Sequence, residues 1–218
     1  MEDIILRIAT MAPGFLLGIV CHEAAHAYAA DRFGDSTARR QGRLSLNPAV
    51  HYDPIGTVLF PLIGAAIGGV MFGWAKPVPV DSRYFKNIRS GIFWVSFAGP
   101  LANILLAILS AFLIAVMIVA VPQDFYLYEQ IFMMIRWSVM INIILAVFNL
   151  IPFPPLDGSK MVSTFLDYEQ ARKYEELQRF SFLFIIILLM TGGFNFIVSP
   201  VISFGFLVIN LFVSLLSW

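Results

Sequence analysis

Two histidines and a glutamate occur together in the run His22-Glu23-Ala24-Ala25-His26, near the end of the first apolar segment. In an α-helix, side chains four residues apart lie on one face, so both imidazoles can reach the same cation. Glu23 lies beside the first histidine, where it can hold a metal-bound water and accept its proton without being a ligand. The spacing therefore predicts a metal-activated water, although two histidines that hydrogen-bond where helices pack would show the same spacing.

A catalytic zinc ion takes three protein ligands and keeps one position open for water, so a third ligand must come from elsewhere. Asp157 is the strongest candidate, because it follows the proline-rich run Pro152–Pro155 at the end of a long apolar segment. Irregular backbone at membrane depth is tolerated only where protein or a water-filled cavity surrounds it. The alternative for Asp157 is an ordinary helix N-cap before Gly158.

The composition is typical of a protein that is embedded in a lipid bilayer. Of the 218 residues, 59% are hydrophobic and only 13% are charged, and the mean hydropathy is +0.82. Soluble domains have about 45–50% apolar and about 25% charged residues. We therefore expect an all-α polytopic membrane protein in contact with the bilayer. The 14 basic and 14 acidic side chains cancel, which gives no electrostatic reason to expect nucleic acid as a partner.

Several apolar segments are long enough to position these residues, because about 20 apolar residues cross a bilayer as a helix. Five full spans are expected, at about 4–30, 92–121, 129–151, 177–190 and 196–216. The first span carries the histidine pair, and the third ends at the proline run before Asp157. We expect one domain over residues 1–218, with a catalytic core at about 4–166 and accessory C-terminal spans at about 175–217.

The apolar stretch Pro54–Ala75 is interrupted by a proline and several glycines, which suits a re-entrant hairpin. Its neighbours, Gly42–Leu46 and Lys76–Val80, are predicted to be short strands, the first from its alternation and the second as a proline-containing edge. If the stretch returns to its starting side, twelve basic residues share one face, and such residues concentrate in cytoplasmic loops. We therefore expect the N-terminus outside, the C-terminus inside, and a cytoplasmic active site in the cell (inner) membrane.

Three motifs together resemble the site-2 protease family of intramembrane zinc metalloproteases. They are H-E-A-A-H at His22–His26, G-P-L-A-N at Gly99–Asn103 and N-L-I-P-F-P-P-L-D-G at Asn149–Gly158. The resemblance covers about Ile4–Leu166, and the combination of motifs is highly specific. The chain is similar to the small members of the family, which have no PDZ-like or CBS-like module.

The resemblance implies one Zn²⁺ per chain, held by His22, His26 and Asp157, with Glu23 as the general base. It also implies that Asn149 stabilises the transition state. The expected reaction is hydrolysis of a peptide bond in or near the transmembrane segment of a membrane protein or peptide, as in regulated intramembrane proteolysis. Substrate, regulator and oligomeric state are left open.

Two further polar residues are candidate neighbours of the active site or the substrate. His51 is as easily explained as an ordinary loop histidine. Asn103, like Asn142, is equally suited to bridging two helices of the bundle. A helical substrate must unwind to expose its carbonyl groups, and pairing with a strand edge at Gly42–Leu46 or Lys76–Val80 would satisfy them.

Two other functions are consistent with the same polar residues. A metal or proton transporter would need polar groups that continue across the bilayer, and the outer halves of the spans offer few. A catalytically silent scaffold would bind no zinc and would tolerate changes at Glu23 and Asp157.

Overall fold

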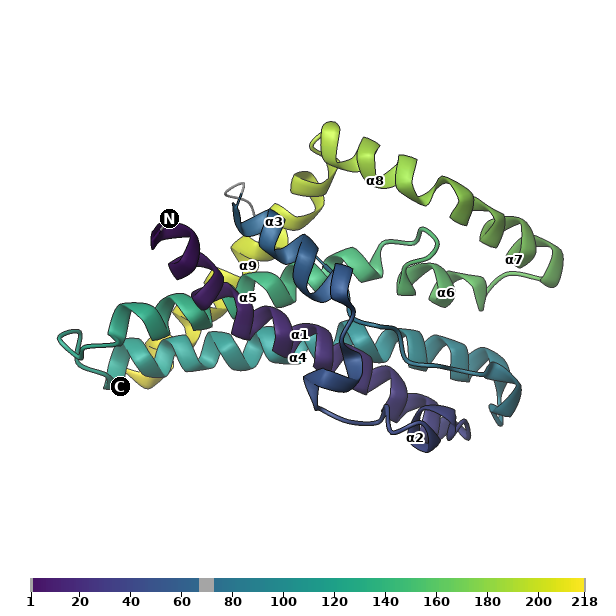
Figure 1. Ribbon diagram of the computed structural model, residues 1–218, viewed down its shortest axis with the longest axis horizontal. Helices are drawn as coiled ribbons and strands as arrows, with labels where there is room; N and C mark the ends of the chain where they lie inside the picture. The colour runs from purple at the N-terminus through teal and green to yellow at the C-terminus, as the bar shows by residue number, and fades with distance from the viewer. Residues whose placement is uncertain (1, 67–72, 218) are drawn as a thin grey trace.

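Three long helices form the centre of the molecule, as the computed structural model shows for residues 2–66 and 73–217 (Figure 1). They are α1 (Glu2–Phe33), α4 (Ile88–Ala120) and α5 (Tyr128–Leu150). Shorter elements connect or flank them: α2 (Thr37–Arg40), η1 (Pro48–His51), η2 (Pro54–Leu59), α3 (Phe60–Ala66), η3 (Ser82–Tyr84), α6 (Asp157–Ser163), α7 (Tyr168–Glu175), η4 (Glu176–Phe180), α8 (Ser181–Met190) and α9 (Gly193–Leu216).

Close packing of α1 against α5 depends on small residues. A Cβ atom added to Gly14 would lie 2.7 Å from the Cα atom of Ser138, and one added to Gly18 would lie 3.0 Å from Asn142 Oδ1. From the pair Gly14–Ser138 to the pair Gly18–Asn142 the residue numbers increase in both helices, so α1 and α5 run in the same direction. Such small residues allow the backbones of membrane helices to approach closely. The region that carries the histidines is therefore held firmly against α5.

The last helix, α9, packs on the face of α4 and α5 that is turned away from α1. There Ile209 lies in a buried cluster with Ala111 and Val139. Its first turn contacts the end of α5 through the ring pair Phe194–Phe148. It then runs back along α5, so the C-terminus lies beside the α4–α5 connection (Figure 1). The prediction that the C-terminus shares the basic end of the molecule is therefore wrong.

Four helices of the described chain are long and apolar enough to cross a membrane, namely α1, α4, α5 and α9. The expected span at 177–190 is wrong as a separate crossing. Charged residues occupy α7 and η4, which leaves α8 only ten residues long. Ten helical residues extend about 15 Å, whereas the hydrocarbon core is about 30 Å thick. Gly192, with a φ of 72°, then separates α8 from α9.

The predicted strands do not form. Within residues 2–66 and 73–217 the structure contains no strand, so the expected β-hairpin is wrong. In Gly42–Leu46, the first residue takes a φ of 67° and donates to Arg39 O, which closes the turn after α2. Lys76–Val80 belongs to no regular element and contains two prolines, which lack an N–H for a ladder. The N–H of Lys76 bonds instead to His51 O, the N–H of Val78 to Glu23, and the carbonyl of Lys76 to Arg43.

The stretch Pro54–Ala75 nevertheless returns to the end from which it departs. Its first part forms η2 and α3, and its last described residues lie beside its beginning. The N–H of Trp74 donates to Gly56 O at 3.1 Å, and the N–H of Lys76 donates to His51 O at 2.9 Å. Residues 67–72, which belong to the predicted re-entrant stretch, lie outside the described residues.

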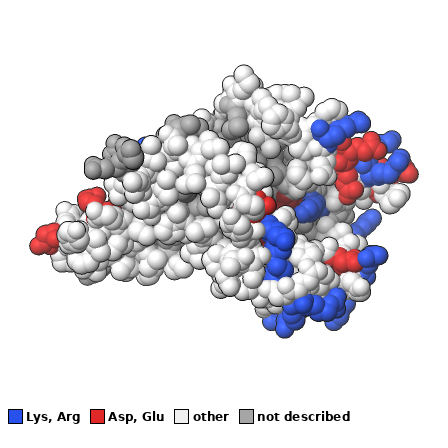
Figure 2. All heavy atoms as spheres, in the orientation of Figure 1, with Lys and Arg blue, Asp and Glu red and all other residues white. Residues whose placement is uncertain are grey.

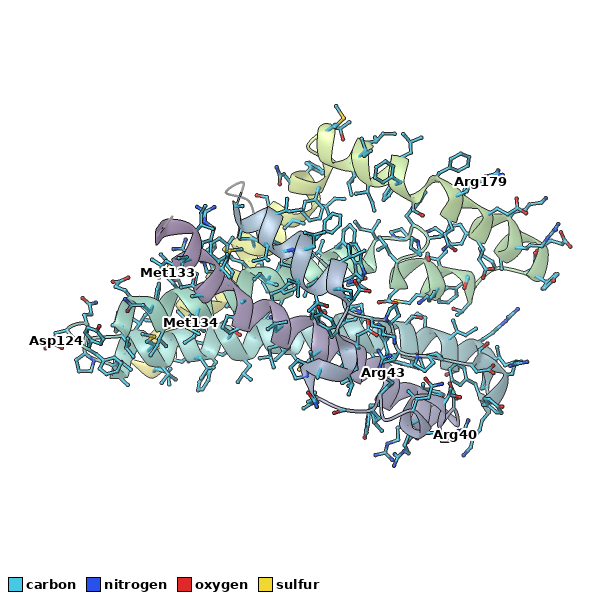
Figure 3. All side chains as sticks on the ribbon, viewed as in Figure 1. Arg40, Arg43, Asp124, Met133, Met134 and Arg179 are labelled. Carbon is cyan, nitrogen blue, oxygen red and sulfur yellow. The ribbon has the colours of Figure 1, made fainter. Side chains whose placement is uncertain are left out.

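Basic side chains gather at one end of the long axis of the molecule (Figure 2). Arg40 and Arg179 lie at this end, whereas Asp124, in the α4–α5 connection, lies at the other (Figure 3). A largely uncharged middle section separates the two ends. This is the charge distribution expected of a protein whose two ends face water on opposite sides of a membrane.

Candidate metal centre

Three potential metal ligands meet at the basic half of the bundle. The Nε2 atoms of His22 and His26 lie 3.0 Å apart, and they lie 3.1 and 3.2 Å from Asp157 Oδ2. All three residues are at least 92% buried, with exposures of 8%, 8% and 6%. Bond lengths of about 2.0–2.2 Å to a tetrahedral zinc ion place its ligand atoms about 3.3–3.6 Å apart, slightly wider than in this triangle. Two imidazole nitrogens and one carboxylate oxygen in this triangle therefore fit zinc in both chemistry and spacing.

The ring of His26 is oriented by the backbone of α4. Its Nδ1 atom lies 2.7 Å from the carbonyl oxygen of Val95. A carbonyl can only accept, so Nδ1 carries the hydrogen and Nε2 presents its lone pair to the cluster. An outer hydrogen bond of this kind is usual for metal-binding histidines.

The ring of His22 is oriented by the side chain of Asn103. The Nδ2 group of Asn103 donates to Gly18 O at 3.0 Å and to Asn142 Oδ1 at 2.9 Å. Its Oδ1 must then be the atom that lies 2.7 Å from His22 Nδ1. His22 therefore also carries its hydrogen on Nδ1, and both rings direct unprotonated Nε2 atoms toward Asp157.

The loop that carries Asp157 is held by the C-terminal part of the chain. Tyr174 Oη donates to Pro152 O at 2.6 Å, and Ser181 Oγ donates to Pro154 O at 3.0 Å. The rings of Phe153 and Phe184 stack with centroids 4.0 Å apart. These contacts satisfy loop carbonyls that have no helical partner and fix the path of the chain into α6.

Asp157 is the first residue of α6, and its Oδ2 atom faces the Nε2 atoms of both histidines. Lys160 Nζ lies 3.5 Å from the second carboxylate oxygen, Oδ1. The carboxylate form, which is the form that binds a metal, is therefore favoured.

Two glycines allow the backbone to pass close to the cluster. A Cβ atom on Gly99 would lie 2.5 Å from His26 Nε2 and 2.6 Å from His22 Nε2, in the space beside the ligand atoms. A Cβ atom on Gly158 would lie 2.3 Å from Leu150 O. Gly99 thus keeps the cluster open, and Gly158 lets Asp157 follow α5 closely.

Glu23 lies beside the cluster without belonging to it. Its Oε2 atom accepts a hydrogen bond from the N–H of Val78 at 2.8 Å. Its side chain is half-buried, and Oε1 has no hydrogen-bond partner in the described part of the chain. One carboxylate oxygen is therefore held in place while the other remains available to a water molecule.

The two other predicted residues contact different groups. Asn149 donates from Nδ2 to Leu145 O at 3.0 Å, one helical turn back. His51 is 1% exposed, and its Nε2 atom lies 2.8 Å from Ser45 O. Among residues 2–66 and 73–217, no hydrogen bond joins either side chain to the three-residue cluster.

The structure also reveals contacts that the sequence reasoning missed. The carbonyl of Val95 and the N–H of Val78 are backbone groups, which motifs of side-chain types do not identify. For Val78 a signal existed, because the run Pro77-Val78-Pro79 has only one backbone donor. The sequence predicts for Asn142 a bridge between helices, and the structure adds that its Oδ1 atom helps to orient Asn103.

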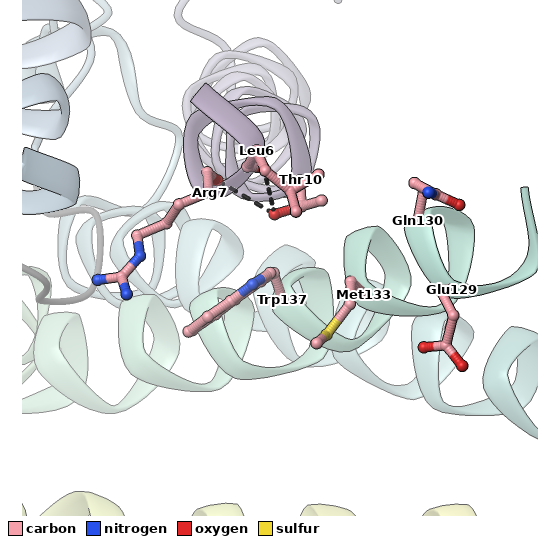
Figure 4. Close-up of a pocket in the computed structure, with 7 residues that line it drawn as sticks. All are labelled: Leu6, Arg7, Thr10, Glu129, Gln130, Met133 and Trp137. Carbon is pink, nitrogen blue, oxygen red and sulfur yellow. Dashed lines mark hydrogen bonds between the residues drawn. The ribbon is translucent and has the colours of Figure 1, made fainter. Parts of the chain in front are cut away.

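A separate hollow of about 470 Å³ opens between the beginnings of α1 and α5 (Figure 4). It is lined by Leu6, Arg7, Thr10, Glu129, Gln130, Met133 and Trp137. This lining contains a single carboxylate and no histidine, so it offers no ligand set for zinc. It also lies twelve or more residues along α1 from His22, a distance of about 18 Å. Among the described residues, the one cluster of three potential metal ligands lies in the other half of the bundle.

Comparison with known proteins gives consistent matches. Residues 116–192 match the model of peptidase family M50. YwhC of Bacillus subtilis (strain 168), provisionally named a zinc metalloprotease, is 35% identical over 194 residues, which cover 87% of this chain and 84% of that protein. Rip2 of Mycolicibacterium smegmatis and Rip2 of Mycobacterium tuberculosis (strain H37Rv), named in the same way, are each 29% identical and cover 84% of this chain and 67% of their own length. No solved structure matches the chain.

Proposed function

The chain belongs to peptidase family M50, the site-2 protease family of zinc metalloproteases, and we propose that it cleaves other membrane proteins in or beside their transmembrane segments. The observation that carries this proposal is the buried triangle of His22 Nε2, His26 Nε2 and Asp157 Oδ2 beside the carboxylate of Glu23. A site for activating water among apolar helices suits a substrate that is itself in the membrane.

In this proposal one Zn²⁺ per chain is held by His22, His26 and Asp157. When bound, it polarises the scissile carbonyl and lowers the pKa of a coordinated water to about 7. Glu23 accepts the proton of the attacking water on its free carboxylate oxygen. It returns that proton to the leaving amine as the carbon–nitrogen bond breaks.

Asn149 is proposed to stabilise the transition state. One N–H of its Nδ2 group donates to Leu145 O, which leaves the second N–H for the oxygen of the scissile carbonyl. Loss of a single donor to a developing oxyanion typically costs about 3 kcal/mol of barrier.

We further propose that the basic end of the molecule faces the cytoplasm of the cell membrane, in line with the preference of Lys and Arg for that side. The metal cluster lies in the same half of the bundle, so cleavage would occur near the cytoplasmic edge of the membrane. Release of a cytoplasmic fragment from such a position suits regulated intramembrane proteolysis.

The transporter alternative is less favoured. A chain of buried polar groups does continue from Asn103 through Asn142 to the Ser138–Ser110 pair, whose oxygens lie 2.9 Å apart. Its members beyond the cluster are amides and hydroxyls, which lack the charge to coordinate a divalent ion along a path. Their contacts instead join α1, α4 and α5.

The test combines metal analysis with cleavage. Purified protein should contain one zinc per chain and should cut a panel of single-span fusion proteins whose transmembrane helices carry glycine or proline. Glu23→Gln should retain zinc and lose cleavage, because the amide cannot accept the proton. Persistent cleavage by Glu23→Gln, or zinc flux into proteoliposomes without proteolysis, would overturn the proposal.

A further inference from the structure

The segment Trp74–Asp81, called the strap below, is anchored on both sides of Glu23. On one side, the N–H of Lys76 donates to His51 O at 2.9 Å, and its carbonyl accepts from Arg43 Nη2 at 2.6 Å. On the other side, the N–H of Asp81 donates to Asp35 Oδ2 at 2.7 Å. The strap is thus connected to the scaffold at residues that flank its contact with Glu23.

The two side chains that anchor the strap are themselves buried. Arg43 is 8% exposed and Asp35 is 0% exposed. The backbone of Arg43 bonds to Ala38 O of α2, and its side chain, labelled near the middle of the view in Figure 3, reaches Lys76 O. Freeing the strap would take the carbonyl partners from Arg43 and one of two N–H partners from Asp35, which is unfavourable for buried charged groups. The anchoring is therefore that of a fixed element and not of a lid that opens with each substrate.

The strap presents a single backbone donor to the active site. In Pro77-Val78-Pro79 the prolines have no N–H, so Val78 supplies the only one, and it donates to Glu23 Oε2 at 2.8 Å. A glutamate side chain has several rotatable bonds and loses considerable conformational entropy when it is fixed. A donor on a rigid strap can select one orientation before substrate binds.

We propose that Val78 is a positioning residue whose N–H holds Glu23 in the orientation for proton transfer. The inference rests on the proposed proteolytic function. The N–H of Val78 bonds to Oε2 and leaves Oε1 without a hydrogen-bond partner among the described residues, so the strap fixes the base while one carboxylate oxygen stays free to accept a proton. Catalytic groups held in the productive geometry gain rate because the orientation is established beforehand.

The direct test is Val78→Pro, which removes the N–H from a segment already flanked by prolines. We expect kcat on the cleavable fusion panel to fall about tenfold, the effect of losing one hydrogen bond worth about 1.4 kcal/mol. KM and zinc content should stay unchanged. Val78→Ala, which keeps the N–H, should retain kcat. Val80→Pro is the matched control, because no hydrogen bond to the Val80 N–H occurs among the described residues. Unchanged or increased kcat in Val78→Pro would overturn the inference.

A second measurement needs no substrate. Hydrogen exchange of the strap in the full-length protein should show a slow Val78 amide that exchanges at least about tenfold faster in Glu23→Ala, since the hydrogen-bond acceptor is lost. Asp35→Ala, which releases the far end of the strap, should speed the same amide and lower kcat without raising KM. A Val78 amide that exchanges equally fast with and without Glu23 would refute the positioning role. That result would leave the protease proposal intact, whereas absent cleavage by the wild-type protein would count against the proposed function alone.

Discussion

Asn103 on α4 accepts a 2.7 Å hydrogen bond from His22 on α1, and this contact decides which ring nitrogen faces the metal cluster. The amide can take only one orientation, because its Nδ2 group already donates to Gly18 O and Asn142 Oδ1. The histidine is thus prepared for metal binding by residues on three different helices.

Replacing Asn103 should therefore weaken zinc binding without removing a ligand. Asn103→Ala leaves His22 free to change tautomer, and loss of such an outer partner typically costs about 10- to 100-fold in metal affinity. Competition with a chromophoric chelator measures the affinity. Asn210→Ala provides a matched control, because Asn210 lies exposed on α9. Equal zinc affinity in the two variants would contradict the orienting role.

Gly99→Ala should abolish zinc binding while the helices still assemble. The new methyl group would lie 2.5 Å from His26 Nε2, where it competes with the ion. Gly205→Ala is the comparison, because its methyl group would meet the flexible end of Ile143 at 2.7 Å and Val139 Cγ1 at an ordinary 3.9 Å. Zinc content by atomic spectroscopy and thermal stability in detergent separate the two effects. A Gly99→Ala protein with a full zinc complement would contradict a metal site in the space beside Gly99.

Removing the metal should lower thermal stability. A ligand that binds only the folded state stabilises it by about 2.7 kcal/mol at a free concentration of 100 times its Kd. We expect a strong zinc chelator to lower the Tm of the wild-type protein and excess zinc to restore it. In His26→Ala the Tm should no longer respond to zinc. A wild-type Tm that ignores both chelator and zinc would exclude a tightly bound structural role for the ion.

The hydrogen bond from Tyr174 of α7 to Pro152, in the loop before Asp157, should help to hold Asp157 in its position at the metal cluster. Tyr174→Phe removes a 2.6 Å hydrogen bond to Pro152 O, a loss of about 1 kcal/mol. We expect a several-fold weaker zinc affinity, because the loop that presents Asp157 becomes less well defined. Tyr168→Phe serves as the control, since Tyr168 is 80% exposed at the start of the same helix. Identical zinc affinities would show that the loop holds its shape without α7.

Substrates with weak helices should be cut fastest. A helical segment hides its carbonyl groups in hydrogen bonds, and glycine or proline near the cut lowers the cost of exposing them. Replacing these residues by leucine in a fusion substrate should slow cleavage, whereas the same change ten residues away should not. Quantifying cleaved fragments in proteoliposomes measures the difference, and equal rates would contradict local unwinding as a requirement.

Much of the site could be predicted because its signals are local in sequence. The spacing of His22 and His26 follows from helix periodicity alone, and the prolines before Asp157 indicate a break in a helix without any tertiary information. Apolar composition likewise indicated spans at α1, α4, α5 and α9. The alternation of Gly42–Leu46 and the prolines of Lys76–Val80 predicted strands that do not form, because a strand needs a neighbouring strand as its partner. Lys76–Val80 bonds instead to Arg43, Glu23 and His51.

Residue types and spacing alone determined that two imidazoles share one face of α1 and that Asp157 ends an irregular, proline-rich loop. Only the tertiary structure decided that these groups meet within 3.2 Å, that Asn103 and Val95 orient the rings, and that Val78 contacts Glu23. The physical reason is that periodicity along one helix is set by local backbone geometry. The meeting of α1, α4 and α6 depends instead on tertiary packing, which brings His22 to Asn103, 81 residues away, and to Asp157, 135 residues away.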